Sequence, residues 1–78
     1  MISYMFFGLE RFRHGLDLGY KEIACYSDEE AISKITSIDG LTVYKVIEPS
    51  PLPGKIPVRV IFYREPDNDL AKKYWPNK

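Results

Sequence analysis

The sequence is poor in the residues that cross-link small proteins or hold metal ions. It contains one cysteine, Cys25, and one histidine, His14. A single cysteine cannot form a disulfide within the chain, and one thiol with one imidazole is too few ligands for a structural zinc ion. We therefore expect no metal or other cofactor, and a reducing compartment, the cytoplasm, suits such a chain.

The sequence also lacks an excess of either charge. Eleven Lys and Arg residues balance eleven Asp and Glu residues. This balance removes the usual electrostatic argument for a protein that binds duplex DNA or an anionic membrane, and for an acidic mimic of nucleic acid. No apolar run approaches the ~18 residues of a membrane span, and residues 1–13 lack the basic segment and cleavage site of a secretory leader. The sequence therefore predicts neither a membrane protein nor a secreted one.

Catalytic motifs are missing as well. The five glycines are dispersed singly, which leaves no glycine-rich phosphate loop. Cys25 and His14 could in principle supply a nucleophile and a base. However, Cys25 shares strand parity with Ile23, as a small core residue would, and no Asn or Asp stands in a recognisable signature for orienting His14. We expect a protein that is not an enzyme, although dispersed residues could still assemble a site.

The chain nevertheless has the material for one folded domain. Of its 78 residues, 45% are hydrophobic and 14% aromatic, which makes wholesale disorder improbable. This length is near the lower limit at which a single core suffices. Residues 1–66 are predicted to form one α+β domain, and residues 67–78 a C-terminal tail that could pack on the sheet.

Apolar periodicity predicts four strands, over residues 2–12, 18–26, 41–48 and 57–65. The turn between the first two is expected at His14 and Gly15, and Gly8 is expected to mark a bulge that could invert the facing of the residues after it. The proline-rich segment 49–57 excludes a regular element between the last two strands. A short helical turn is expected in the tail, with Asp67 or Asn68 as its cap.

The stretch CYSDEE, residues 25–30, predicts the start of a helix over residues 28–38. Ser27 at the N-cap and Glu30 three residues later form a capping box, and Asp28 and Glu29 lie where the helix dipole favours acids. A metal site made by these three carboxylates is disfavoured, because neighbouring helical side chains point about 100° apart. The helix is expected to bury one stripe and to end at Gly40. The stripe consists of Ala31, Ile32, Ile35 and Ile38.

The order of these elements predicts an antiparallel sheet with the helix on one face. A helix between the second and third strands can leave these two strands parallel, with one strand between them. With hairpins joining the first pair and the last pair, the expected strand order is 1-2-4-3, a permuted ferredoxin-like plait. A meander of order 1-2-3-4 is the alternative.

Strand parity divides the side chains of this sheet between two faces. The helix-facing set is expected to be Met5, Phe7, Leu9, Ile23, Cys25, Leu41, Val43, Ile47, Val58, Val60 and Phe62. The opposite set is Tyr4, Phe6, Tyr20, Glu22, Tyr26, Thr42, Tyr44, Val46, Arg59, Ile61 and Tyr63. The second set holds five of the six tyrosines, and one helix cannot cover both faces of a four-stranded sheet.

Tyrosine is enriched at the cores of protein interfaces, so the second face is the candidate binding surface. The expected function is a small protein-binding module, an adaptor or a stoichiometric inhibitor of the kind found among phage and mobile-element accessory proteins. A homodimer through the same face is a further expectation. The candidate binding residues are Tyr4, Phe6, Tyr20, Tyr26, Tyr44, Arg59, Tyr63 and Trp75.

Three alternatives remain open at this stage. The tyrosines could simply tolerate a half-wet strand surface, with the tail folding back over part of it through Leu70, Tyr74 and Trp75. The face could instead stack the bases of a single-stranded nucleic acid, with phosphates meeting Arg11, Arg13, Arg59 and Arg64, although zero net charge disfavours this. A small-ligand or enzyme domain with a dimer cleft is the third.

Overall fold

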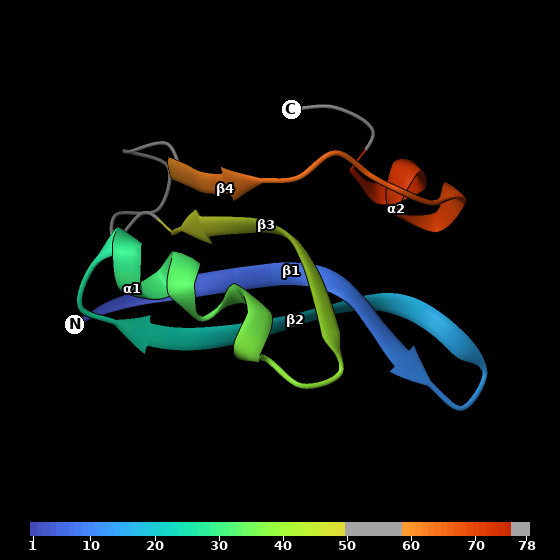
Figure 1. Cartoon of the computed structure of the whole chain (residues 1–78), viewed down its shortest axis with the longest axis horizontal. Helices are drawn as coiled ribbons and strands as arrows, with labels where there is room; N and C mark the ends of the chain where they lie inside the picture. Colours follow the sequence, from blue (N-terminus) through green and yellow to red (C-terminus); the bar gives the residue numbers. More distant parts are fainter. Residues whose placement is uncertain (50–58, 76–78) are drawn as a thin grey trace.

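The computed structural model describes residues 1–49 and 59–75 and shows a four-stranded antiparallel open sheet with one main helix. Figure 1 shows α1 packed near the start of β1, whereas α2 lies at the opposite end of the sheet. The predicted α+β class is confirmed. The elements are β1 Ile2–Phe12, β2 Gly15–Cys25, α1 Asp28–Ser33, the 3₁₀ turn η1 Ile35–Ser37, β3 Leu41–Glu48, β4 Arg59–Tyr63 and α2 Asp69–Tyr74.

The predictions on Pro51, Pro53, Pro57 and Val58 lie outside the described residues. Among the described residues, no helix has the length and apolar character needed to cross a membrane.

The predicted strand order is wrong. The observed order is β2-β1-β3-β4, so neither the ferredoxin-like order 1-2-4-3 nor the meander is adopted. Both predicted hairpin neighbours do pair, and β2 and β3 are parallel with one strand between them, but that strand is β1 instead of β4. The reason is apolar content: β1 and β3 carry most of the buried strand residues, whereas β2 alternates apolar with charged side chains and suits an edge.

The β1–β2 hairpin is tight. Phe12 pairs with Gly15, which leaves Arg13 and His14 as a two-residue loop. Gly15 has a φ of 121°, a conformation that side chains with a Cβ rarely adopt. The turn was therefore predicted in the right place, but β2 begins three residues earlier than expected.

Gly8 is needed for close approach of two strands. A Cβ on Gly8 would lie 2.0 Å from the carbonyl oxygen of Thr42 in β3. The register shifts at this point, since Phe7 pairs with Lys45 but Gly8 pairs with Val43. The extra residue of the bulge is thus Tyr44 in β3, and the predicted bulge lies in the strand opposite Gly8.

The predicted facing of β1 is inverted. Tyr4 and Phe6, expected on the open face, are fully buried beneath α1. Tyr4 tolerates this position because its hydroxyl donates a hydrogen bond to Asp28 at the start of α1, 2.7 Å away. The helix-side core consists of Tyr4, Phe6, Cys25, Ala31, Leu41, Val43 and Val46.

The capping prediction for α1 is confirmed at Ser27, whose hydroxyl accepts the Glu30 N–H at 3.2 Å. The Glu30 carboxylate reaches back one residue further than expected, to the Tyr26 N–H. The helix is shorter than predicted, because Ser33 and Ser37 hydroxyls bond backbone carbonyls and β-branched residues follow, which favours a 3₁₀ turn.

Gly40 does not cap α1. With a φ of 78°, it forms the turn between η1 and β3. Ile32, expected in the buried stripe, is exposed, whereas Ala31 is buried and Ile35 and Ile38 pack against the core.

The tail packs on the sheet face opposite α1. Asn68 caps α2 by accepting the Ala71 N–H at 2.8 Å, as one of the two predicted caps. Ala71 and Trp75 form a second buried cluster with Leu9 and Tyr44. The covered face thus corresponds to the alternative in which the tail folds back.

Candidate contact surface

The α2 side of the sheet divides into a covered half and an open half. Phe7 and Leu9 of β1 pack against the α2 cluster, and their cross-strand neighbours in β2 are Tyr20 and Leu18. These two β2 side chains therefore share the face of α2, but α2 does not cover them. Leu16, Leu18 and Tyr20 are 45%, 45% and 59% exposed. We call these three side chains the β2 surface.

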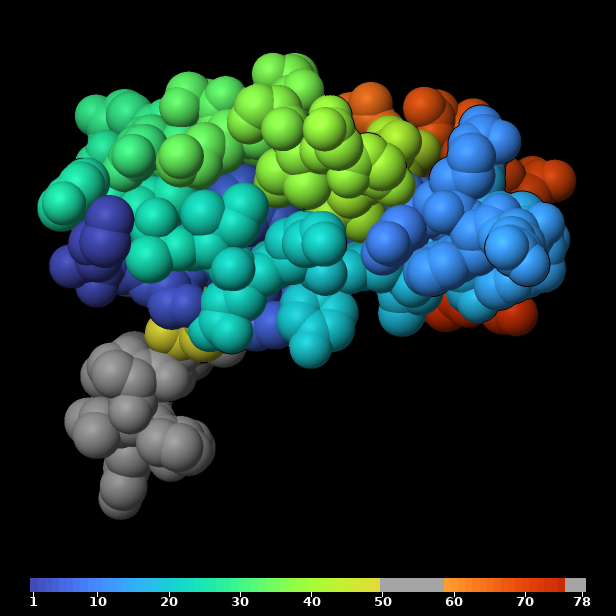
Figure 2. Space-filling model, turned by 90° about the horizontal axis from the view of Figure 1, so that it is seen from below, coloured from blue at the N-terminus to red at the C-terminus, as the bar shows by residue number. Residues whose placement is uncertain are grey.

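The same strand is one edge of the sheet. Figure 2 looks onto this edge. It shows β2, in cyan, with no other segment in front of it and with α1, in green, above it. Phe12 and Gly15 close the two-residue hairpin as a hydrogen-bonded pair, so the odd-numbered residues of β2 form the backbone hydrogen bonds to β1. The backbone N–H and C=O groups of the even-numbered residues point away from β1, outward from the edge of the sheet. In agreement, the Leu18 N–H donates to its neighbour, the Asp17 carboxylate, at 2.7 Å. A long edge with exposed apolar side chains is a template for pairing with another strand.

Most predicted binding residues do not lie on this surface. Tyr4 and Phe6 are fully buried under α1, and Tyr44 is 1% exposed. Their expected accessibility is therefore wrong. Trp75, 9% exposed, packs in the α2 cluster, and the half-buried Tyr63 donates its hydroxyl to the Trp75 carbonyl oxygen at 3.1 Å.

The Tyr44 ring contacts two side chains, Trp75 and Arg64. Trp75 stacks on it at a ring-centroid distance of 5.4 Å, and the Arg64 guanidinium lies 4.2 Å from its ring centroid. Its hydroxyl donates to Asp67. Burial and this hydrogen bond to an acid raise the pKa of Tyr44, and the same bond lowers the pKa of Asp67. Tyr44 is therefore a residue of the second core.

Arg59 and Tyr26 are exposed but far from Tyr20 in the fold. Arg59, on β4, bonds the Asp28 carboxylate with both terminal nitrogens, at 2.8 and 3.0 Å, and reaches Glu48 at 2.6 Å. Tyr26 precedes α1. Of the predicted binding residues, only Tyr20 belongs to the β2 surface.

The network around Asp28 joins α1 to the sheet. Hydrogen bonds from Arg59 and then from Tyr4 lower the pKa of Asp28 to about 2. The same contact raises the pKa of Tyr4 to about 12, and the two acids beside Arg59 raise the pKa of its guanidinium. Asp28 is thus held ionised and fully engaged, an arrangement that stabilises the fold and offers no proton donor near neutral pH.

Cys25 and His14 do not come together. Cys25 pairs with Ile2 at one end of the β1–β2 ladder, whereas His14 is in the loop at the other end, 3.5 Å from Asp17. Burial raises the pKa of the Cys25 thiol, and the nearby Glu30 adds to this effect. A buried thiol of raised pKa is not an activated nucleophile. Among the described residues, no three acidic, Cys or His side chains converge as metal ligands.

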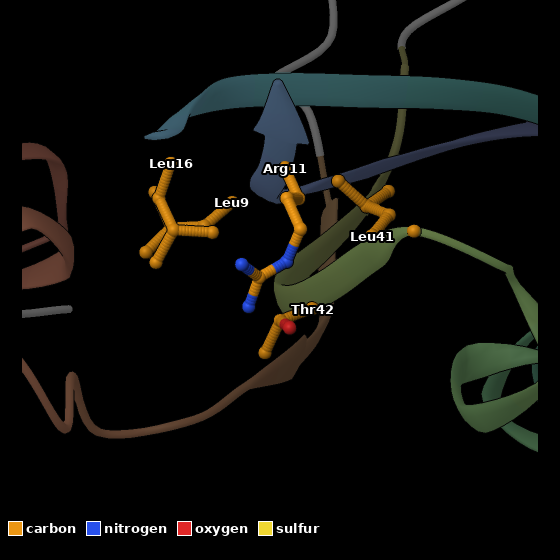
Figure 3. Close-up of a pocket in the computed structure, with 6 residues that line it drawn as sticks. Leu9, Arg11, Leu16, Leu41 and Thr42 are labelled. Atoms are coloured by element: carbon orange, nitrogen blue, oxygen red, sulfur yellow. The ribbon is translucent and has the colours of Figure 1, made fainter. Parts of the chain in front are cut away.

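Open hollows lined by described residues include the following two. The first, about 240 Å³, is at the hairpin end of the sheet, where the Arg11 side chain extends from β1 toward Thr42 and Leu9 and Leu16 form an apolar wall (Figure 3). The second, about 220 Å³, is lined by Phe7, Lys45, Ile47 and Trp75. Neither lining contains a carboxylate, imidazole or thiol.

Sequence reasoning missed Leu16 and Leu18. The expected second strand begins at Leu18, which leaves Leu16 in the connection before it. The alternation of Leu16, Leu18 and Tyr20 with Asp17 and Lys21 is the strand signal that could have found them.

Comparisons of the chain with protein-family models, with curated proteins and with solved structures found no match.

Proposed function

We propose that the chain is a non-catalytic protein-binding module that uses β2 as its contact strand. The observation that carries the proposal is the β2 surface: three large apolar side chains at alternate positions of an eleven-residue edge strand, each more than two-fifths exposed. Water-exposed apolar side chains gathered on an open strand edge are typical of interaction sites. The tyrosine-rich face expected from the sequence is replaced in this role by Leu16, Leu18 and Tyr20.

The expected occupant is an extended strand of a protein. Addition of a strand to β2 would satisfy the outward N–H and C=O groups, and alternate side chains of the incoming strand would cover Leu18 and Tyr20. Main-chain hydrogen bonds would supply much of the affinity, while the apolar side chains would exclude water from them. An adaptor or a stoichiometric inhibitor works in this way, by occupying the surface of a larger protein.

A protein partner is favoured over single-stranded nucleic acid. Base stacking needs an accessible aromatic platform beside a positive groove. Tyr4 and Tyr44 are buried, and Arg59 and Arg64 already face acids or an aromatic ring. What remains for nucleic acid is the exposed Tyr20 on β2 together with the exposed Arg11 and Arg13 at the hairpin.

The test compares two double variants with the wild-type chain. Leu18→Thr with Tyr20→Thr removes the β2 surface while keeping residues that favour strands. Tyr26→Thr with Ile32→Thr is the matched control, because these two side chains are also exposed but lie beside and on α1. We expect the β2 variant to lose at least tenfold in affinity for its protein partner, in binding measured with purified components after capture in the presence of nuclease.

The control should bind as the wild type does, and both variants should melt cooperatively. Equal binding by the wild type and both variants would contradict the proposal. Binding that nuclease abolishes would favour nucleic acid instead.

A further inference from the structure

We infer that the strand which pairs with β2 is β2 of a second copy of this chain, antiparallel to the first and centred on Gly19. This inference rests on the proposed function, since it names the partner of the same strand. It follows from the arrangement of charges along β2, which is complementary to itself in one register.

The register centred on Gly19 is compatible with the backbone. When two antiparallel copies are related by a twofold axis, residues whose backbone N–H and C=O groups point away from β1 must pair with residues of the same kind. Centring on Gly19 puts Leu18 of one copy opposite Tyr20 of the other, and both belong to the outward, even-numbered set. On the α1 side of the sheet it puts Asp17 opposite Lys21, and symmetry makes this contact twice.

The neighbouring symmetric registers lack this complementarity. Centring on Leu18 places Asp17 opposite Gly19, and centring on Tyr20 places it opposite Ile23. Centring on Asp17 or on Lys21 sets like charges face to face, which is unfavourable. Of these five registers, the one centred on Gly19 alone sets opposite charges across the axis.

The isolated chain has an acidic pair at this position that a lysine would balance. Glu10 of β1 is the direct cross-strand partner of Asp17. The Glu10 side chain leans over Gly19, since a Cβ there would be 2.6 Å from its Oε1 atom. Within residues 1–49 and 59–75, the structure shows Asp17 paired with His14 alone, and neither Glu10 nor Lys21 in an ion pair.

Lys21 of the second copy would meet both acids. It would stand directly opposite Asp17 and diagonally across from Gly19, over which the Glu10 carboxylate lies. In response, the Asp17 carboxylate would release the Leu18 N–H, which would then donate to the backbone carbonyl of Tyr20 in the second copy. The shift of the Asp17 carboxylate from the Leu18 N–H to Lys21 of the second copy thus frees this N–H for strand pairing and forms the ion pair.

The other face gains a continuous apolar row. Within one copy Phe7 and Tyr20 are in contact, with ring centroids 6.0 Å apart, and Leu9 is paired with Leu18. Pairing Leu18 with Tyr20 across the axis joins these into a row that runs from β1 of one copy to β1 of the other. The dimer would be one eight-stranded sheet in which the two β2 edges disappear.

Sedimentation of the purified chain over a wide concentration range tests the inference. We expect a reversible dimer for the wild type. Lys21→Asp and Asp17→Lys each place like charges opposite one another twice, and each should weaken dimerisation at least tenfold. The double variant Asp17→Lys, Lys21→Asp restores opposite charges and should dimerise within about threefold of the wild type. Lys72→Asp on α2, which is exposed, is the control and should not change the dimer.

The outcomes separate the second copy from the proposed function. A wild-type chain that stays monomeric at every concentration would overturn the inference. If Leu18→Thr with Tyr20→Thr still abolished binding of another protein, the proposed function would stand with that protein as partner. A dimer that the single charge variants leave unchanged, or that the double variant fails to restore, would overturn the register centred on Gly19. The cooperative melt of each variant is the check on folding.

Discussion

The α2 side of the sheet has two halves that differ in what covers them. In the β3–β4 half, Tyr44 contacts Trp75 and Arg64, and Tyr63 donates a hydrogen bond to the backbone of Trp75. In the β2 half, Tyr20 contacts Phe7 but is 59% exposed. A tyrosine on a strand thus becomes a core residue where another segment supplies a ring contact and a hydroxyl partner. Tyr20 contacts a ring as well, but its side chain stays largely exposed.

The two edges of the sheet differ in the same way. β4 has five residues and begins with Arg59, which is bound to Asp28 and Glu48. A short edge strand with an engaged charge resists further pairing. β2 has eleven residues and carries Leu16, Leu18 and Tyr20 outward on one face. The edge available to a partner strand is therefore β2.

The largest expected effect is in the covered half. Tyr44→Ala should lower the free energy of unfolding by about 3–5 kcal/mol, because it leaves a cavity where a buried ring contacts Trp75 and Arg64 and removes the hydrogen bond to Asp67. Urea denaturation measures it. Tyr20→Ala, the matched change in the open half, should cost less than about 1 kcal/mol. Equal costs at the two tyrosines would show that the two halves do not differ.

An intermediate effect concerns acid. The folded pKa of Asp28, about 2, lies below its ordinary value of 3.8, so the carboxylate stabilises the fold above pH 4. That contribution is lost as the pH falls from about 4 to about 2. The urea midpoint of the wild type should fall across this window.

In Arg59→Met, the fall in the midpoint should be smaller and shifted to higher pH, because the main cause of the lowered pKa is gone. Arg13→Met, in the exposed hairpin loop, is the control for loss of a positive charge elsewhere on the surface. An identical acid profile for the wild type and Arg59→Met would refute the role given to this network.

The smallest expected effect on stability is in the open half. Leu18→Thr with Tyr20→Thr should change the free energy of unfolding by less than about 1 kcal/mol, since both side chains are largely exposed. The same variant is expected to lose association with protein. A large loss of stability, measured by urea denaturation, would mean that the β2 surface is part of the core.

Local signals in the sequence were sufficient for several elements. The bounds of β1 and β3, the N-cap at Ser27 and the cap of α2 at Asn68 were predicted, because strand alternation and capping depend on residues close in the chain. The pairing of each hairpin was also predicted, since it follows from chain connectivity.

What failed depends on contacts between distant residues. The burial of Tyr4 needs the carboxylate of Asp28, 24 residues away. The position of Tyr44 needs a bulge created by the approach of β3 to Gly8, and its cover comes from the tail. The inverted first strand put Tyr4 and Phe6 on the wrong face, because side chains alternate between the faces of a sheet. Tyr44 and Trp75 are inaccessible for another reason, since the tail covers their face.

Amide hydrogen exchange of the wild-type chain at low and at high concentration, resolved by residue, tests most directly whether two copies meet at β2. If two copies meet at β2, the amides of Leu16, Leu18, Tyr20 and Glu22 become protected as the concentration rises, while those of β4 do not change. Protection that is independent of concentration along β2, or that grows at β4 instead, would contradict β2 as the strand at which the two copies meet.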